Sequence, residues 1–222
     1  MKSRSHLTRT RVKICGFTRA KDALCAANLG VDAIGLVFYE SSPRHVSLEQ
    51  AQAIIAALPP FITVVGLFVN AQRTEIDQVI DQLALDVLQF HGDEDQVFCS
   101  SFKLPYIKAV RVQQGSDIIQ AAQTFNDAQG LLLDAWHPDI QGGTGLQFDW
   151  SLLAQELTEG LTLPLILAGG LNSGNVYTAI ETTQPYAVDV SSGVESDKGI
   201  KDSLRMENFL KEVDRFGSTR KL

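Results

Sequence analysis

Residues 165–195 read LILAGGLNSGNVYTAIETTQPYAVDVSSGVE, and this stretch decides the fold. Two short apolar runs, 165–168 and 187–190, are each followed at once by small residues, Gly169-Gly170 in the first case and Ser191-Ser192-Gly193 in the second. Their separation of about 20 residues is what a strand, a loop, a helix and a return loop require. The stretch therefore predicts a β/α unit in which both strands end in a tight turn.

The same unit recurs along the chain. Short runs rich in Val, Ile, Leu and Phe alternate with amphipathic segments of helical length, which is typical of a parallel sheet covered by helices. The predicted strands are 12–15, 33–38, 63–68, 87–90, 106–111, 130–134, 165–168 and 187–190. The clearest predicted helices are 20–29, 48–57, 75–83 and 203–213, with Ser47 and Asn70 as helix starts.

Eight such units fit either a closed (β/α)₈ barrel or an open doubly wound sheet. Polar, glycine-containing and reactive residues follow most of the strands, and a barrel brings all eight strand ends to one mouth, whereas an open sheet separates them. We therefore expect a single-domain α/β protein, a (β/α)₈ TIM barrel over residues 11–222. The strand-end residues are Cys15-Gly16, Ser42-Pro43-Arg44, His91-Gly92, Asp134, Gly169-Gly170 and Ser191-Ser192-Gly193.

Composition limits the partners of the protein. The 222 residues carry a net charge of −7 with acidic residues spread along the chain, which argues against nucleic acid, because phosphate backbones select clustered Lys and Arg. No apolar run approaches the about 20 residues that a membrane span needs. We expect a cytoplasmic protein with no membrane partner that works as a monomer or a homodimer.

Two further features exclude other classes of protein. Residues 1–10 are basic and hold no apolar run, so they are predicted to be an N-terminal extension without a core-forming pattern and not a signal peptide. Cys15, Cys25 and Cys99 are too widely spaced for a disulfide framework, and neither they nor the four histidines show metal-ligand spacing. We expect reduced thiols and no metal, with Cys25 and Cys99 packing in helices.

The turns after the last two strands are predicted to bind phosphate. Because Gly and Ser add little bulk, backbone amides there can approach a phosphate closely. A plain tight turn would explain one Gly-Gly pair, but two such turns at consecutive strand ends of a barrel favour phosphate. No Lys or Arg stands within the two loops. The candidate phosphate-binding residues are Gly169, Gly170, Ser191, Ser192, Gly193 and Asn172, which is also expected to set the shape of its loop.

A glycine-rich segment after the sixth strand is a candidate lid. Gly142, Gly143, Thr144 and Gly145 follow an irregular stretch that begins at Trp136. Glycines absorb the backbone rotation that loop closure needs, so we expect this loop to close over substrate and exclude water. A long surface loop without a catalytic role is the alternative.

Cys15 and Asp134 are the candidate acid/base pair. Cys15 ends the first strand, so its thiol is expected to point into the mouth and act as a general base; a small buried apolar residue is the alternative. Asp134 ends the run Leu131-Leu132-Leu133, where a carboxylate needs a partner or a role. We expect Asp134 to be a general acid, with capping of a loop as the alternative.

Other polar residues are expected to border the substrate. Arg44 is the candidate for binding a substrate carboxylate through its bidentate guanidinium, with a surface ion pair as the alternative. His91 is expected to face the mouth, and Asp189, at the end of the eighth strand, competes with Asp134. His45 is interpreted as structural because adjacent residues tend to point apart. Lys13 is interpreted as pointing away from the mouth.

Several motifs occur in a fixed order along the chain: KICGFT (13–18), SPR (42–44), GLFVN (66–70), LQFHG (88–92), LD (133–134), GGTG (142–145), FDW (148–150), AGGLN (168–172) and DVSSGVE (189–195). In this order and spacing they resemble phosphoribosylanthranilate isomerase of tryptophan biosynthesis. The match runs from the first strand to the last helix. Motifs that are weak one by one become specific through their arrangement.

The resemblance implies a ketol isomerase, an intramolecular oxidoreductase that needs no cofactor. Its reaction is the Amadori rearrangement of N-(5-phosphoribosyl)anthranilate to 1-(2-carboxyphenylamino)-1-deoxyribulose 5-phosphate, a step of L-tryptophan biosynthesis. It implies Cys15 as the general base and Asp134 as the general acid. It also implies that Arg44 binds the anthranilate carboxylate and that the last two strand-end turns bind the phosphate of this small-molecule substrate.

Two other functions remain open. A neighbouring barrel reaction, such as indoleglycerol-phosphate synthesis or a histidine-pathway isomerisation, would keep the phosphate site, but it is expected to use carboxylate or Lys chemistry, and Cys15 counts against it. A catalytically silent barrel that binds sugar phosphates or partner proteins is disfavoured by the intact Cys15 and Asp134.

Overall fold

The structure, a computed structural model, describes residues 9–135 and 161–219. Eight parallel strands follow one another in sequence order around a closed barrel, and β1 pairs with β8 to complete the ring. The expected (β/α)₈ barrel is therefore confirmed. The strands are β1 (Arg11–Cys15), β2 (Ala33–Val37), β3 (Thr63–Phe68), β4 (Val87–Phe90), β5 (Tyr106–Val112), β6 (Gly130–Ala135), β7 (Leu165–Leu167) and β8 (Ala187–Val190).

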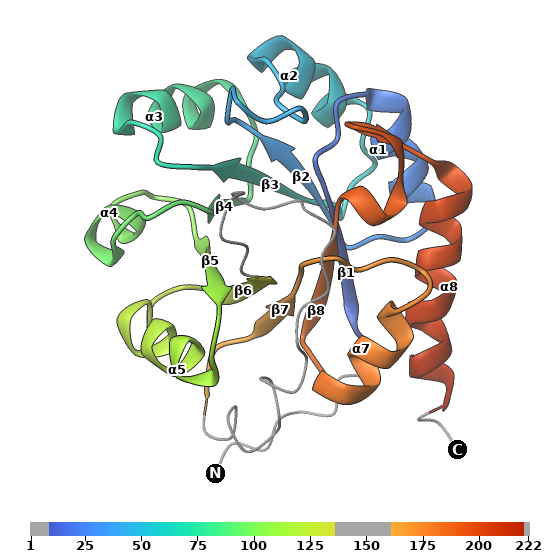
Figure 1. The fold of residues 1–222 in the computed structure, drawn as a ribbon. Coiled ribbons are helices and arrows are strands. Elements are labelled where there is room, and N and C mark those ends of the chain that lie inside the picture. Colours follow the sequence, from blue (N-terminus) through green and yellow to red (C-terminus); the bar gives the residue numbers. More distant parts are fainter. Residues whose placement is uncertain (1–8, 136–160, 220–222) are drawn as a thin grey trace.

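Helices surround the barrel on its outside, as Figure 1 shows. Each described helix before α8 follows a barrel strand and returns the chain to the start of the next one, which is the right-handed crossover that parallel strands need. The described helices are α1 (Ala20–Asn28), α2 (Leu48–Ala56), α3 (Arg73–Gln82), α4 (Gln96–Ser100), α5 (Gly115–Thr124), α7 (Val176–Thr183) and α8 (Ser203–Thr219). Among these described helices, none is long and apolar enough to cross a membrane.

The two predicted helix starts have different outcomes. Ser47 caps α2 in a capping box with Gln50, as its residue type predicts. Asn70 does not cap α3, whose N-cap is Gln72. Asn70 instead adopts a left-handed φ of 51° and accepts a hydrogen bond from the backbone N–H of Asp93 at 2.7 Å. A tertiary contact across the barrel rim has outweighed the local capping preference.

Side chains alternate between two cores along the strands. Val12 and Ile14 on β1 belong to the large core between the barrel and the helices, whereas Cys15 belongs to a smaller cluster with Val37 and Leu67. A second inner cluster contains Ala109, Leu132, Ile166, Ala168 and Ala187. Because successive strand residues face opposite ways, Cys15 and the residue two before it point into the barrel.

The three thiols are free. Cys99 is buried in the outer core and Cys25 packs against that core, so their expected role as packing residues is confirmed. At the amino end of the barrel, the guanidinium of Arg9 forms an ion pair with Asp32, and Thr10 is buried. Residues 1–8 of the expected N-terminal extension lie outside the described residues.

A small hairpin follows β8 and was not predicted. After the short 3₁₀ helix η2 (Ser192–Val194), strands β9 (Glu195–Asp197) and β10 (Ile200–Lys201) pair antiparallel, with Gly199 in the turn at a φ of 76°. The pairing places Lys201 opposite Glu195. This hairpin brings two charged side chains back to the mouth of the barrel.

Candidate active site

A layer of polar side chains crosses the inside of the barrel near the carboxyl ends of the strands. Strand alternation turns Lys13, Gln89, Asp134 and Asp189 inward, because their neighbours in sequence lie in the outer core. All four are buried. Asp189 interacts electrostatically with Lys13, His91 and Asp134. The candidate base and acid thus open onto the same interior.

Cys15 lies at the end of β1 with 6% of its surface exposed. A side chain at Gly35 on the neighbouring strand would stand 2.6 Å from the Cys15 sulfur, so only glycine leaves room for the thiol there. Two donors bind the Cys15 carbonyl, the Ser191 hydroxyl at 2.9 Å and the Lys201 ammonium at 2.6 Å. Burial raises the pKa of the thiol above its ordinary value, and the positive charge of Lys13 opposes that rise.

Lys13 points into the barrel, which corrects the interpretation that it points away. Its ammonium lies 2.9 Å from an oxygen of Asp189, and both side chains are almost fully buried. Burial alone would lower the pKa of Lys13, but attraction to Asp189 and then to Cys15 outweighs it, so that pKa is raised. The spacing of two residues from Cys15 along a strand was the signal that would have found this residue.

Asp134 is hydrogen-bonded in series with His91 and Gln89. Gln89 Nε2 lies 3.0 Å from His91 Nδ1, and His91 Nε2 lies 3.1 Å from Asp134 Oδ2. If the Gln89 amide donates, His91 carries its proton on Nε2 and donates it in a hydrogen bond to the Asp134 carboxylate. With the amide turned over, His91 Nδ1 donates to the amide oxygen and Nε2 accepts a hydrogen bond from a protonated Asp134. The arrangement therefore allows Asp134 to hold or to release a proton, and it confirms that His91 faces the mouth.

Arg44 is bound to the hairpin. Its Nε and Nη2 donate to the two carboxylate oxygens of Glu195, each at 2.8 Å, and Glu195 also accepts from Lys201 at 2.7 Å. This pair is partly buried, unlike the surface ion pair considered above. Within the described residues, Nη1 has no hydrogen-bond partner, so the end of the guanidinium formed by Nη1 and Nη2 can still bind a carboxylate.

The turns after β7 and β8 are held close together. Gly169 and Gly170 have left-handed φ angles of 77° and 68°, which glycine adopts without strain. A side chain at Gly193 would stand 1.9 Å from the carbonyl oxygen of Leu171, so the second turn packs directly on the first. Asn172 donates to the Gly170 carbonyl and accepts from the Gly174 N–H, which confirms that it sets the shape of its loop.

The hydroxyl of Ser191 is bound to the Cys15 carbonyl, so this residue links the second turn to the candidate base. Lys201, which stands outside the two loops in sequence, reaches the Ser191 carbonyl at 3.2 Å. Sequence reasoning missed this lysine because only the hairpin brings it to the loop. The candidate lid residues Gly142, Gly143, Thr144 and Gly145 lie outside the described residues.

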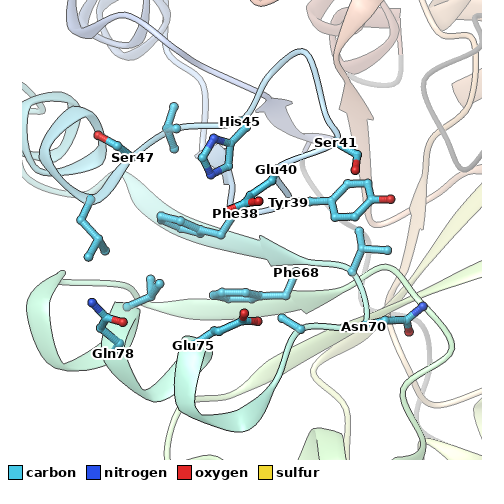
Figure 2. Close-up of a pocket in the computed structure, with 15 residues that line it drawn as sticks. Phe38, Tyr39, Glu40, Ser41, His45, Ser47, Phe68, Asn70, Glu75 and Gln78 are labelled. Atoms are coloured by element: carbon cyan, nitrogen blue, oxygen red, sulfur yellow. The ribbon is translucent and has the colours of Figure 1, made fainter.

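A separate cavity of about 400 Å³ lies between the ends of β2 and β3 and the starts of α2 and α3. Figure 2 shows Phe38 and Phe68 stacked in it, with the His45 ring turned toward Phe38. His45 and Arg44 thus point apart, as expected for adjacent residues. Neither Cys15 nor Asp134 lines this cavity. Within the described residues, no group of three or more His, Cys, Asp or Glu could hold a metal ion.

Together, the barrel and this polar layer define a (β/α)₈-barrel enzyme whose ionisable groups meet at the carboxyl ends of the strands, where such enzymes have their active sites. The family described as N-(5'phosphoribosyl)anthranilate (PRA) isomerase matches residues 12–212. The chain belongs to that family. This confirms the family and the isomerase class that the sequence motifs indicate.

Curated relatives and solved structures agree with this assignment. The N-(5'-phosphoribosyl)anthranilate isomerase of Azotobacter vinelandii is 57% identical over 203 residues, which cover 91% of this chain and 97% of the relative. That of Pseudomonas syringae pv. tomato is 56% identical over 207 residues, covering 93% and 98%. The crystal structure of phosphoribosyl anthranilate isomerase from Thermotoga maritima superposes with a TM-score of 0.85 at 39% identity, covering 93% of this chain and 99% of that one.

A further solved structure shows phosphoribosyl anthranilate isomerase in complex with reduced 1-(o-carboxyphenylamino)-1-deoxyribulose 5-phosphate. It superposes with a TM-score of 0.82 at 38% identity, covering 93% of this chain and 99% of that one. That relative therefore binds a molecule with a carboxylate at one end and a phosphate at the other.

Proposed function

We propose that this chain converts N-(5-phosphoribosyl)anthranilate to 1-(2-carboxyphenylamino)-1-deoxyribulose 5-phosphate by general acid/base catalysis, with Asp134 as the acid and Cys15 as the base. The observation that carries the proposal is that both groups open onto one buried polar layer at the mouth of a barrel of this family. The reaction is a step of L-tryptophan biosynthesis. It moves hydrogen within one molecule, so neither an oxidant nor a cofactor is required.

The acid acts first. Asp134 gives a proton to the ring oxygen of the sugar, the bond from that oxygen to carbon 1 breaks, and a protonated Schiff base forms between carbon 1 and the anthranilate nitrogen. His91 supports this role because it can accept the hydrogen bond of a protonated Asp134 while Gln89 satisfies its other nitrogen. We further propose that His91 borders the substrate.

The base acts second. The thiolate of Cys15 takes the proton from carbon 2, which leaves a neutral enolamine that tautomerises to the ketone. Each positioned proton transfer contributes on the order of 10² to 10⁴ in rate. Gly35 supports this role because a side chain there would collide with the Cys15 sulfur.

The two ends of the substrate have separate binding groups. Arg44, held by Glu195, offers the Nη1 and Nη2 end of its guanidinium to the anthranilate carboxylate. The backbone amides of Gly169, Gly170, Ser191, Ser192 and Gly193 surround the phosphate, with Asn172 shaping the first turn. Asp189 borders the sugar from β8. The loop that contains Gly142, Gly143, Thr144 and Gly145 is proposed as the lid that excludes water.

The cellular location and the oligomeric state are part of the same proposal. We propose that the protein works in the cytoplasm as a monomer or a homodimer; a related structure from Thermotoga maritima is described as monomers generated from a dimeric isomerase. Size-exclusion chromatography with light scattering distinguishes the two states. A silent barrel that only binds sugar phosphates would show phosphate affinity without turnover.

The test follows the loss of phosphoribosylanthranilate fluorescence with the wild type, Cys15→Ser and Asp134→Asn. We expect both variants to lose activity by about 10² to 10⁴. Cys25→Ser is the matched control, since it removes a thiol from α1 and should retain wild-type activity. Full activity in either site variant would remove its assigned role, and an inactive wild type would remove the function.

A further inference from the structure

Three lysines are buried in the described part of the chain, and their partners differ. Lys108 donates to the Gly92 carbonyl at 2.6 Å and to Glu94 at 2.9 Å, so it holds a loop. Lys201 donates to the Cys15 and Ser191 carbonyls as well as to Glu195. Lys13 instead donates only to a side chain within the described residues, the Asp189 carboxylate at 2.9 Å. It also interacts electrostatically with the Cys15 thiol, two residues further along the same strand.

The backbone fixes this arrangement. Lys13 and Cys15 are two residues apart on β1, so both point into the barrel. The closing pair of strands places Lys13 directly beside Asp189 in the register of β1 and β8. The ammonium therefore stands next to the thiol on its own strand and the carboxylate on the neighbouring one, in a space where all three side chains are nearly inaccessible to water.

The proposed function requires Cys15 to act as a thiolate, and a lone thiolate buried there would be costly. We propose that Lys13 is a positioning residue that serves two acids in turn, forming an ion pair with Asp189 at rest and stabilising the Cys15 thiolate when the base is active. A proton that leaves the thiol is taken by the Asp189 carboxylate. The three groups then keep a net charge of zero in both states.

This exchange prepares the base without adding a charge to the interior. In the resting state the groups are a thiol, an ammonium and a carboxylate; in the active state they are a thiolate, an ammonium and a carboxylic acid. When the thiolate takes the carbon 2 proton from the protonated Schiff base, the positive charge of the substrate passes with that proton to the three groups. Lys13 never needs to lose its own proton.

Several ionisable side chains surround the thiol, and their effects differ in sign. Lys13 and Lys201 lower the pKa of Cys15, whereas Asp189 raises it together with burial. Arg44 also interacts with the thiol, and Tyr39 packs beside it. Since Lys13 and Asp189 act in opposite directions, replacing each should move the thiol pKa in opposite directions. A merely structural role of the ion pair would not produce that result.

The test is alkylation of Cys15 by iodoacetamide between pH 6 and pH 10, followed by peptide mass spectrometry, which separates the three cysteines. It uses the full chain without substrate, so it does not depend on turnover. We expect Lys13→Met to slow Cys15 alkylation at pH 7 by about tenfold or more, and Asp189→Asn to accelerate it by a similar factor. Lys13→Arg, which keeps the charge, should remain within about threefold of the wild type.

Lys108→Met is the matched control, because it removes a buried, ion-paired lysine that faces away from Cys15. Its Cys15 alkylation should match the wild type. If Lys13→Met and Asp189→Asn change the rate of Cys15 alkylation in the same direction, or if neither changes it, the proposal is overturned. If Lys13→Met does not fold, Asp189→Asn alone tests the proposal. Unchanged or slower alkylation of Cys15 in that variant contradicts the proposed proton exchange between Cys15 and Asp189.

The inference rests on the proposed function, and the two fail in different ways. An active Cys15→Ser enzyme would remove Cys15 as the base and leave the alkylation result intact. If the inference holds together with that function, the rise of kcat/KM with pH should move to higher pH in Lys13→Met and to lower pH in Asp189→Asn. Lys13→Arg should keep the wild-type profile.

Discussion

The mouth of the barrel has two sides that hold their catalytic groups by different means. On the base side, formed by β1, β8 and the β9–β10 hairpin, Lys13, Asp189, Glu195 and Lys201 form buried ion pairs around Cys15. On the acid side, formed by β4 and β6, Asp134 is joined by hydrogen bonds to a histidine and, through it, to an amide. Fixed charges therefore surround the base, whereas a histidine tautomer accompanies the acid.

The difference follows from what each proton transfer needs. A thiolate in a dry site needs cations that are already in place, because they cost no reorganisation when the charge forms. A general acid needs to hold a proton and then release it, which an amide and an imidazole can accommodate by exchanging donor and acceptor roles. Stability should therefore depend strongly on the base side, and the acid side should affect turnover more than stability.

The largest expected effect is a loss of stability when the ion pairs of Glu195 on the base side are removed. Glu195→Ala leaves Arg44 and Lys201 without their carboxylate, and an uncompensated buried charge costs about 3–5 kcal/mol. Urea denaturation measures this loss. Glu207→Ala, which removes an exposed pair with Lys211, is the control and should cost less than about 1 kcal/mol. Equal losses in both variants would show that the buried pairs of Glu195 stabilise the fold no more than an exposed pair does.

The next effect is on the acid side and should appear in turnover. His91→Ala removes a hydrogen-bond partner of Asp134, and loss of a hydrogen bond to a charged group corresponds to about a 10- to 100-fold fall in kcat/KM. Steady-state kinetics and a urea curve are compared for the same variant. His45→Ala, outside the mouth, should keep wild-type kcat/KM. A large loss of stability in His91→Ala with unchanged kinetics would reverse the comparison.

The pH dependence of stability gives a second test of the Glu195 ion pairs on the base side. Burial alone would raise the pKa of Glu195, but hydrogen bonds from Arg44 and the charge of Lys201 bring it below its ordinary value of 4.5. The folded state therefore binds this proton less readily than the unfolded state, and the stabilisation present above pH 4.5 is lost as pH falls. The difference in unfolding free energy between wild type and Glu195→Gln should shrink from pH 6 to pH 4, and a constant difference would contradict this.

The smallest expected change in stability is at Gln89. As the amide is placed, its Oε1 is buried without a hydrogen-bond partner in the described part of the structure, and with the amide turned over Nε2 takes that position. Gln89→Leu removes that atom, so the free energy of unfolding should change by no more than about 1 kcal/mol. Turnover should still fall, though less than in His91→Ala, since His91 loses the group that binds Nδ1. Wild-type turnover in Gln89→Leu would show that the acid needs no such chain.

The sequence could predict the barrel because each strand is a short apolar run of regular spacing, and all eight barrel strands were placed to within one residue at each end. It also placed Cys15, His91 and Asp134 at the mouth, since position at a strand end is a local property. Lys13 was misjudged, although its spacing from Cys15 already required both to share a face.

The pairing of charges could not be predicted in the same way. Glu195 meets Arg44 and Lys201 only because the chain forms an unpredicted hairpin after β8. The prediction that Asn70 starts a helix was wrong, because its hydrogen bond with the backbone of Asp93, in the loop after β4, decides its conformation. Such partners lie far apart in sequence, and no local pattern records them.

The closure of the barrel by β1 and β8 has a consequence for synthesis of the chain. The contacts of Cys15 with Ser191 and Lys201, and of Lys13 with Asp189, join residues that are 176 to 186 positions apart. At about 5–20 residues per second, a ribosome completes the first strand many seconds before the last. Until then Cys15 and Lys13 lack these contacts. A nascent chain that stops before β8 and the hairpin therefore cannot surround Cys15 with Ser191, Lys201 and the Lys13–Asp189 pair.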